Sequence, residues 1–244
     1  RQLIAGAAGF IGTNLTLALM KNPANHITIT DTDTSYFTNE TIIAANNVSC
    51  LALHTQTHNF ENILENIDLV FHLVSTTNPS SSNNDIEAEL NENITFSTRL
   101  LEASVKHHVS KIIFISSGGT VYGNVACPIT ENAPTNPITA YGIQKLTIEK
   151  ICHLYHCMHG IDYSILRLAN PYGPYQRPNG KLGALTTFTY KALHQETLHV
   201  YGDGSVVRDY IYIDDAIDAM LKIAFGSPQY LSLIHISEPT RRTP

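Results

Sequence analysis

The sequence has no tryptophan, three methionines and only four cysteines in 244 residues. The cysteine spacing resembles neither a disulfide framework nor a zinc ribbon, so we expect reduced thiols in a cytoplasmic protein. No apolar run reaches the roughly 18 residues that a membrane helix needs, and the glycine-broken start is unlike a signal peptide. We therefore expect no membrane partner. The cysteines are Cys50, Cys127, Cys152 and Cys157.

Charged residues are also scarce, at 15% of the chain, and the formal net charge is -6. This balance argues against broad nucleic-acid binding, so we expect no nucleic-acid partner. A local basic pocket for one phosphate stays compatible with it. Hydrophobic residues make up 43% of the chain, enough for a sizeable buried core.

Histidine is abundant, with 12 residues, and is densest in the stretch CHLYHCMH at 152–159. On a helix, His153, His156 and Cys157 would share a face, which is compatible with a metal site. No carboxylate or outer ligand completes such a site, so we favour a solvated helix face and predict no metal.

Short apolar runs alternate with longer amphipathic stretches, which predicts βαβ units. The apolar runs are rich in Val, Ile and Leu without alternation, as in strands covered on both faces. The predicted class is α/β, with a Rossmann-like doubly wound parallel sheet over 1–168 and a smaller, truncated α/β domain over 169–230. The predicted strands are 2–5, 26–30, 48–53, 68–74, 111–116 and 163–168, and the predicted helices are 10–20, 61–66, 86–107, 140–159, 182–194 and 214–225.

The segments after residue 168 differ from the rest of the chain in composition and in hydrophobic pattern. ANPYGPYQRPNG at 169–180 is rich in Pro, Gly and Tyr and predicts a loop. The final stretch, LSLIHISEPTRRTP, has no clear period beyond its first residues and resembles the translation of a sequencing-library adapter. We therefore expect 231–244 to be a non-native tail and leave it out of the fold prediction.

Three glycines in IAGAAGFIGTNL, at 4–15, are spaced three residues apart: Gly6, Gly9 and Gly12. They follow a predicted strand and open a predicted helix, which is the context of a dinucleotide-binding turn. Glycine lets the backbone approach a pyrophosphate, and the helix N-terminus offers free N–H groups. Such a triplet alone is weak evidence, because glycines also serve ordinary turns.

The second predicted strand, in HITITDTD, ends in Asp31, nineteen residues after Gly12. An acidic residue at about this distance accepts a hydrogen bond from the adenosine ribose 2′-hydroxyl. A carboxylate there repels the 2′-phosphate of NADP, and Asp33 adds further negative charge, so NAD is the predicted cofactor. The alternative is that Asp31 only begins a turn.

Tyr141 and Lys145 lie four residues apart in AYGIQK and would share one helix face. A tyrosine is normally a poor base, with a pKa near 10. A nearby ammonium group and an oxidised nicotinamide favour the phenolate, so Tyr141 could take a proton from an alcohol.

Several stretches resemble the extended short-chain dehydrogenase/reductases of the NAD-dependent epimerase/dehydratase family, in the order that the family shows. The resemblance implies that 1–168 binds NAD and that 169–230 is part of a substrate domain. The implied NAD residues are Gly6, Gly9, Phe10, Ile11, Gly12, Asp31, Leu73, Val74, Ser75, Tyr141 and Lys145, with Lys145 lowering the pKa of Tyr141. Asn170 and Arg208 would bind the nucleotide sugar. The matching stretches are GAAGFIG, VFHLVS, NITFSTRLLEAS, FISSGGTVYG, YGIQK, LRLANPYGP and VYGDGSVVRDYIYIDD.

One departure concerns the family's catalytic Ser or Thr, which stands four residues before the Tyr of VYG. Here that position is Gly118, and Ser117 or Thr120 could supply the hydroxyl instead. Positions 118–120 also lack the acid of family members that dehydrate or decarboxylate the sugar.

The resemblance therefore favours a UDP-glucose 4-epimerase-like enzyme in which Tyr141 takes the C4 hydroxyl proton and hydride returns to the other face of the sugar. The alternatives are a nucleotide-sugar dehydratase or reductase and a non-catalytic NAD-binding sensor. A UDP-linked sugar is the expected substrate, and a homodimer through a helix pair is implied.

Overall fold

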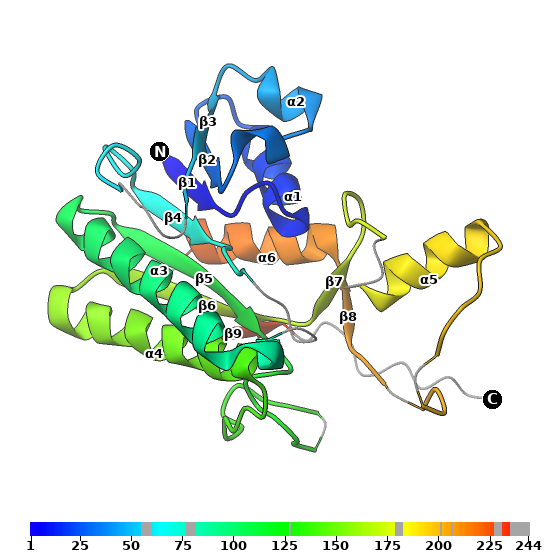
Figure 1. Cartoon of the computed structure of the whole chain (residues 1–244). Helices are drawn as coiled ribbons and strands as arrows, with labels where there is room; N and C mark the ends of the chain where they lie inside the picture. Colours follow the sequence, from blue (N-terminus) through cyan, green and yellow to red (C-terminus); the bar gives the residue numbers. More distant parts are fainter. Residues whose placement is uncertain are drawn as a thin grey trace.

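A parallel sheet of seven strands runs through the centre of the protein in the order β3-β2-β1-β4-β5-β6-β9 (Figure 1). The computed structural model describes residues 1–54, 60–76, 82–126, 128–178, 183–200, 202–205 and 207–226, and the backbone of 231–234. All six predicted strands are confirmed to within about two residues at their ends, the usual uncertainty of such boundaries. The strands are β1 (Gln2–Ala5), β2 (Ile27–Asp31), β3 (Val48–Ala52), β4 (Leu69–His72), β5 (Lys111–Ser117), β6 (Asp162–Leu168) and β9 (Leu231–Ile234).

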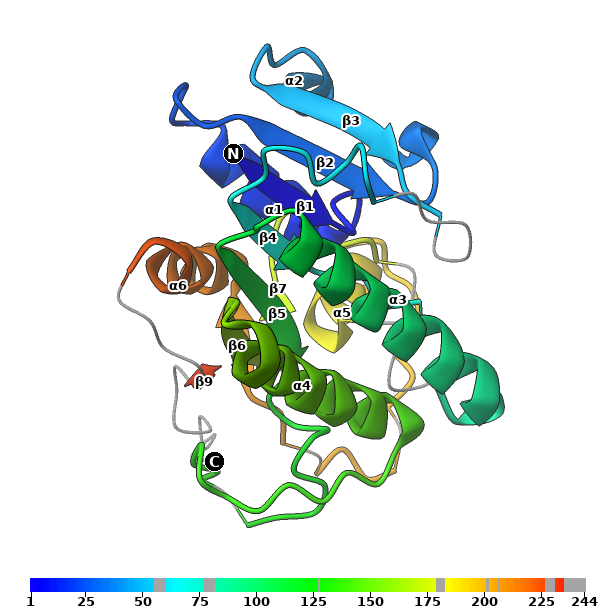
Figure 2. The same ribbon diagram turned by 90° about the vertical axis from the view of Figure 1, so that its left-hand side faces the viewer.

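Helices cover both faces of this sheet, which confirms the predicted doubly wound class. Helices α1 (Phe10–Leu19) and α6 (Ile213–Phe225) lie on one face, and α3 (Ile86–Lys106) and α4 (Ala140–His159) lie on the other (Figure 2). Although α6 falls within the segment 169–230, it packs against α1 and the sheet.

Alternate residues of the central strands enter two separate hydrophobic cores. Leu3, Val70 and Ile112 belong to the core under α3 and α4. Ile4 and Phe71, their neighbours along the chain, belong to the core under α1 and α6. Because both faces are covered, the strands carry apolar residues at every position rather than at every second one.

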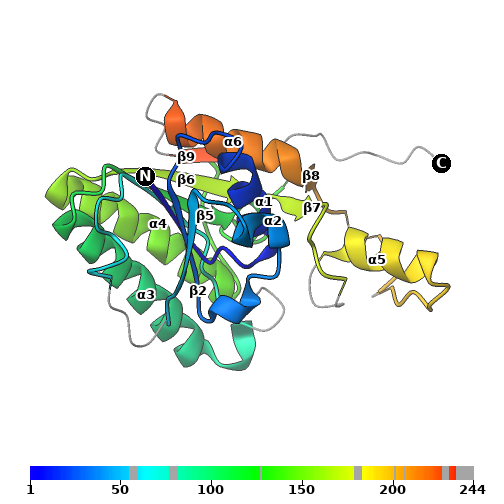
Figure 3. The ribbon, with the colours of Figure 1, turned by 90° about the horizontal axis from the view of Figure 1, so that it is seen from above.

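A smaller unit follows β6. Strands β7 (Asn170–Tyr172) and β8 (Tyr210–Tyr212) form a separate two-stranded parallel sheet. Helix α5 (Ala184–Leu193) stands away from the central layers, as the view from above shows (Figure 3). The prediction of a loop over 169–180 is therefore wrong at 170–172, where the partner strand lies about 40 residues later in the sequence.

The predicted helix over 61–66 is also wrong, because this segment forms turns. Its Leu64 N–H donates to the Phe60 carbonyl, but Asn66 takes a positive φ of 58°, which stops a helix from continuing. The apolar pattern that suggested a helix comes from Ile63, Leu64 and Ile67, which all enter the core. Several short elements were not predicted. They are α2 (Glu40–Ile43), the 3-10 turns η1 (Thr34–Tyr36) and η2 (Ser82–Asn84), and the strands β7, β8 and β9.

Among the residues that the structure describes, no helix is both long enough and apolar enough to cross a membrane. The longest described helix, α3, has 21 residues but carries several acidic side chains.

Leu100 on α3 is 0% exposed, whereas Leu193 on α5 is 78% exposed, so the two leucines form a matched test of the core. We expect Leu100→Ala to lower the free energy of unfolding by about 2–5 kcal/mol, because it removes buried methyl groups and leaves a cavity. Leu193→Ala should change it by less than about 0.5 kcal/mol. Urea denaturation measures both, and equal losses in the two variants would contradict this packing.

Candidate active site

The turn between β1 and α1 is closed by glycines that have different tasks. Gly6 takes a positive φ of 85°, and a Cβ there would lie 2.9 Å from the Val74 backbone nitrogen. A Cβ at Gly12 would lie 2.5 Å from the Ala7 Cα. At Gly9, by contrast, the nearest such atom is the Gly6 carbonyl oxygen, at 3.7 Å. Gly6 and Gly12 are therefore needed for packing, while Gly9 leaves open space in front of the helix N-terminus.

This geometry fits a dinucleotide. Gly9 is the N-cap of α1 and has no side-chain cap, so the first N–H groups of the helix have no side-chain acceptor from this residue. Free N–H groups and a helix dipole at an uncrowded turn are what a pyrophosphate requires. A cavity of about 730 Å³ opens beside this turn, lined among others by Thr13, Tyr36 and Arg177.

Asp31 lies at the end of β2, beside the glycine turn. Its Oδ2 accepts a hydrogen bond from the Ala8 N–H at 3.0 Å, and its Oδ1 accepts one from the Thr32 N–H at 2.9 Å. These two bonds orient the carboxylate at the carboxyl end of the parallel strands, where the predicted contact with the ribose 2′-hydroxyl would be made.

The end of β4 meets the same turn. The Leu73 N–H donates to the Ala5 carbonyl at 2.9 Å, and Val74 approaches Gly6 closely. Of the predicted NAD residues, those of the first turn therefore lie next to Leu73 and Val74, although Gly6 and Val74 are 68 positions apart in the sequence. Phe10 and Ile11 follow Gly9 in the first turn of α1, and both are half-buried.

Tyr141 and Lys145 lie in the first turns of α4, which is capped by Thr139. The Thr139 side-chain oxygen accepts from the Gly142 N–H at 3.1 Å and starts the helix. Lys145 is only 3% exposed, and its Nζ donates to the Ile115 carbonyl of β5 at 2.9 Å. The same Nζ lies 5.5 Å from the centroid of the Tyr141 ring. The structure thus brings the predicted pair together.

Burial shifts the pKa values of both groups. It lowers the pKa of Lys145 to about 8, and the carboxylates of Glu89 and Glu149 oppose this shift. It also raises the pKa of Tyr141 to about 12, with a further contribution from Glu89. The expected lowering of the Tyr141 pKa by Lys145 is therefore not the net effect of the protein, because desolvation of the phenolate is larger than the attraction of one ammonium group.

The segment after β5 carries the two candidate hydroxyls. Ser117 Oγ accepts from the Thr120 N–H at 3.3 Å, so Ser117 supports the turn. Thr120 Oγ1 is buried and has no hydrogen-bond partner within the described part of the chain. A Cβ at Gly142 would lie 2.4 Å from the Thr120 carbonyl oxygen, so Thr120 packs directly against the start of α4.

Gly118 lies tightly against β6. Its N–H donates to the Leu168 carbonyl at 2.8 Å, and a Cβ there would lie 3.1 Å from the Arg167 carbonyl oxygen. This close approach disfavours the larger side chain that the family resemblance leads one to expect at this position.

Asn170 and Arg208, the predicted substrate residues, belong to the small β7–β8 unit. Asn170 Nδ2 donates to the Asp209 carbonyl at 2.8 Å, which holds the residue beside the strand that follows Arg208. Both side chains are exposed, and the Arg208 guanidinium donates to its neighbouring Val207 carbonyl at 3.0 Å.

Two buried groups near the pair were missed in the sequence. Glu89 is 1% exposed on α3 and acts on the pKa values of Tyr141 and Lys145. His72 ends β4, with Nε2 2.7 Å from Ser97 Oγ, and burial followed by the charge of Lys145 lowers its pKa to about 3. The buried face of α3 is partly polar, so its apolar period did not reveal Glu89.

The histidine-rich end of α4 shows no metal geometry in the described residues. His153 Nδ1 lies 3.0 Å from the Tyr163 hydroxyl, and His156 Nδ1 lies 3.0 Å from the Ile161 carbonyl oxygen. Cys157 Sγ lies 3.6 Å from His153 Nε2. The Tyr163 contact joins the helix to β6, the Ile161 contact joins it to the connection before that strand, and the Cys157 contact lies within the helix.

Comparisons with known proteins show which enzymes this chain is similar to. The UDP-glucose 4-epimerase of Mycolicibacterium smegmatis is 31% identical over 237 residues, covering 91% of this chain and 72% of that protein. The dTDP-4-dehydro-6-deoxyglucose reductase of Escherichia coli is 31% identical over 224 residues, covering 90% of this chain and 71% of that protein.

A crystal structure of the UDP-glucuronic acid 4-epimerase of Bacillus cereus, in complex with UDP-glucuronic acid and NAD, superposes with a TM-score of 0.88 at 30% identity. The match covers 97% of this chain and 78% of that one. A family model described as the NAD dependent epimerase/dehydratase family matches residues 2–226. These findings confirm the predicted cofactor, NAD. The chain belongs to the NAD dependent epimerase/dehydratase family.

Proposed function

We propose that this chain is a nucleotide-sugar 4-epimerase that keeps NAD bound and interconverts UDP-glucose and UDP-galactose. The observation that carries the proposal is the pair of half-buried Tyr141 and buried Lys145. Both lie on α4, which follows β5 in the sequence. Strands β1, β4 and β5 are neighbours in the sheet, so the pair lies at the same end of the sheet as the glycine turn. Ligands of open parallel sheets bind at the carboxyl ends of such strands. Gly6, Gly9, Gly12, Asp31 and the residues after β4 would hold the dinucleotide there.

Tyr141 would remove the proton of the sugar C4 hydroxyl. The chemistry that bound NAD would supply at that carbon is reversible hydride transfer. Lys145 would donate to the nicotinamide ribose and favour the phenolate of Tyr141 by its charge. Thr120 would hydrogen-bond the C4 oxygen, because its hydroxyl is buried at the start of α4. Asn170 and Arg208 would bind the nucleotide diphosphate, for which a guanidinium fork is suited.

Positions 118–120 are Gly, Gly and Thr, so this segment offers no carboxyl group for dehydration. The 4-epimerases among the similar proteins support the same choice of reaction. The similarity to a dTDP-4-dehydro-6-deoxyglucose reductase favours a reductase as the second candidate. A reductase would consume NADH with a 4-keto sugar nucleotide, whereas the epimerase leaves the nicotinamide oxidised after each turnover.

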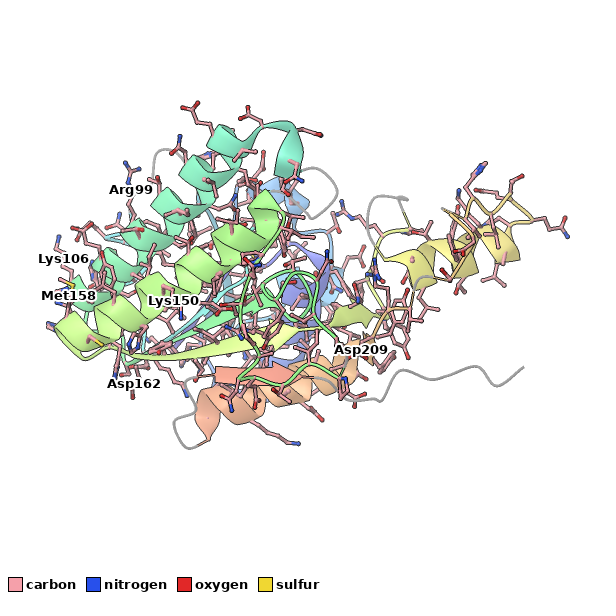
Figure 4. All side chains as sticks on the ribbon, turned by 90° about the horizontal axis from the view of Figure 1, so that it is seen from below. Arg99, Lys106, Lys150, Met158, Asp162 and Asp209 are labelled. Atoms are coloured by element: carbon pink, nitrogen blue, oxygen red, sulfur yellow. The ribbon has the colours of Figure 1, made fainter. Side chains whose placement is uncertain are left out.

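A homodimer through a helix pair stays a prediction, and α3 and α4 are the candidate pair. The two helices lie side by side on one face, with Lys150 and Met158 on α4 and Arg99 and Lys106 on α3 (Figure 4). Leu154 and Met158 are exposed there and would suit a helix-pair contact.

Gly9→Ala and Gly12→Ala separate cofactor binding from folding. At Gly9 the added Cβ makes only an ordinary contact with the protein, 3.7 Å from the Gly6 carbonyl oxygen, so we expect normal stability but NAD affinity weakened by at least about tenfold, or 1.4 kcal/mol. At Gly12 the Cβ would overlap Ala7, so we expect a loss of stability. Calorimetric titration with NAD and thermal melting measure the two effects, and normal NAD affinity in Gly9→Ala would contradict the proposed turn.

The wild-type protein, loaded with NAD, should convert UDP-galactose to UDP-glucose. Tyr141→Phe should remove nearly all turnover, by about 10²–10⁴-fold, because it lacks the proton acceptor. NAD should stay bound in this variant. Tyr155→Phe, on the same helix but 14 residues further along, serves as the control. If the folded, NAD-loaded wild-type protein does not interconvert the two sugars, the proposed epimerase activity is wrong. If the Tyr141→Phe variant stays active, the assignment of Tyr141 as the base is wrong.

Thr120→Val tests the hydroxyl with little change of shape. We expect kcat to fall on the order of 10²-fold with a smaller change in KM, because the lost hydrogen bond acts on the reacting oxygen. Ser117→Ala should cost much less, and Thr147→Val, at an exposed site on α4, controls for the substitution itself. A larger loss in Ser117→Ala than in Thr120→Val would assign the role to Ser117.

A further inference from the structure

An ion pair between Arg167 on β6 and Glu149 on α4 is buried between the sheet and the helix. Arg167 Nε donates to Glu149 Oε1 at 3.0 Å, and Nη2 donates to Oε2 at 2.6 Å, so the contact is bidentate. The two side chains are only 5% and 4% exposed. None of the proposed chemical steps uses either residue.

Each member of the ion pair makes one further side-chain hydrogen bond. Arg167 Nη1 donates to the Tyr122 hydroxyl at 2.8 Å, and Ser116 Oγ donates to Glu149 Oε1 at 2.5 Å. Tyr122 is 0% exposed. The guanidinium of Arg167 therefore contacts both α4 and the segment that follows β5. Its planar shape fixes the directions of these hydrogen bonds.

Each member adjoins a part of the proposed site. Glu149 lies one helical turn after Lys145 and two turns after Tyr141, on the same face of α4. Tyr122 lies two residues after Thr120 in the segment that also contains Ser117. Arg167 precedes Leu168, whose carbonyl accepts from the Gly118 N–H at 2.8 Å. The network thus joins the base, the candidate hydroxyls and the strand that leads to Asn170.

A buried ion pair adds little to the free energy of folding, because the cost of desolvating two charges is about as large as their attraction. Its geometric demands are high, however, since every donor must find its acceptor. We propose that Arg167, Glu149, Tyr122 and Ser116 form a positioning network that sets the Thr120 hydroxyl relative to Tyr141. The inference rests on the proposed function for its catalytic consequence, and on the contacts above for the coupling itself.

Tyr122→Phe removes one hydroxyl from this network without changing any charge. Tyr163→Phe is the matched control, because Tyr163 is also buried, lies near the opposite end of β6, and has a hydroxyl 3.0 Å from His153 Nδ1. We expect similar small decreases in melting temperature in both variants, about 2–4 °C. Only Tyr122→Phe should lower kcat, by about tenfold with KM nearly unchanged, because the site is displaced rather than emptied.

Amide hydrogen exchange measures the coupling without substrate. We expect exchange at 117–122 and in the first turn of α4 to become about tenfold faster in Tyr122→Phe than in Tyr163→Phe. Arg167→Lys is a second variant that keeps the charge but cannot reach both partners as the fork does, and it should act in the same direction.

The outcomes separate the two proposals. Faster exchange confined to 117–122 and the start of α4 supports the network, even if the wild type shows no epimerase activity. A wild type without that activity rejects the proposed function alone. Unchanged exchange in Tyr122→Phe, faster exchange spread over the whole chain, or an equal loss of kcat in Tyr163→Phe would overturn the positioning role. If Arg167→Lys does not fold, Tyr122→Phe and its control decide.

Discussion

A buried ammonium group, that of Lys145, is the constraint on which the site depends. It lies under α4 against the end of β5, where the Ile115 carbonyl accepts one of its protons at 2.9 Å. A cation is costly to bury unless other groups compensate for the lost water. The carboxylates of Glu89 and Glu149 supply part of that compensation from two different helices, as their effect on the pKa of Lys145 shows. Helix α4 cannot shift along the sheet without breaking the hydrogen bond from Lys145 to Ile115.

Burial also decides the protonation state of the Tyr141 phenol. With a pKa of about 12, its phenol is neutral in the protein alone, and Glu89 strengthens that state. Proton removal from a sugar hydroxyl therefore needs additional positive charge near the ring, which an oxidised nicotinamide would bring. The low dielectric that raises the pKa also strengthens such a charge effect once the dinucleotide is bound. In the proposed epimerase, Tyr141 would therefore act as a base only with the dinucleotide bound, which suits a cofactor that stays in place.

Close backbone packing brings together the segments that are proposed to bind NAD. Gly6 lets the first turn lie against Val74, and Gly12 lets α1 lie against Ala7, so the ends of β1 and β4 meet beside the helix N-terminus. Gly9 has the opposite task, since nothing in the protein occupies the space that its side chain would fill. The three glycines are therefore not interchangeable, although they look alike in the sequence.

The sequence by itself determined six of the seven strands of the central sheet, the two long helices α3 and α4, the glycine turn and the Tyr141–Lys145 spacing. These depend on apolar periods, caps and helix geometry, which neighbouring residues along the chain largely set. Strand β9 was not among the predictions, because 231–244 was left out of the fold prediction. The helix expected at 61–66 failed, because the core and not helix periodicity selects Ile63 and Leu64. Only the tertiary structure decided that Glu89 is buried near the tyrosine, that Arg167 pairs with Glu149, and that the tyrosine pKa rises. Desolvation and ion pairing depend on residues from separate elements, and their distances exist only after the layers have packed.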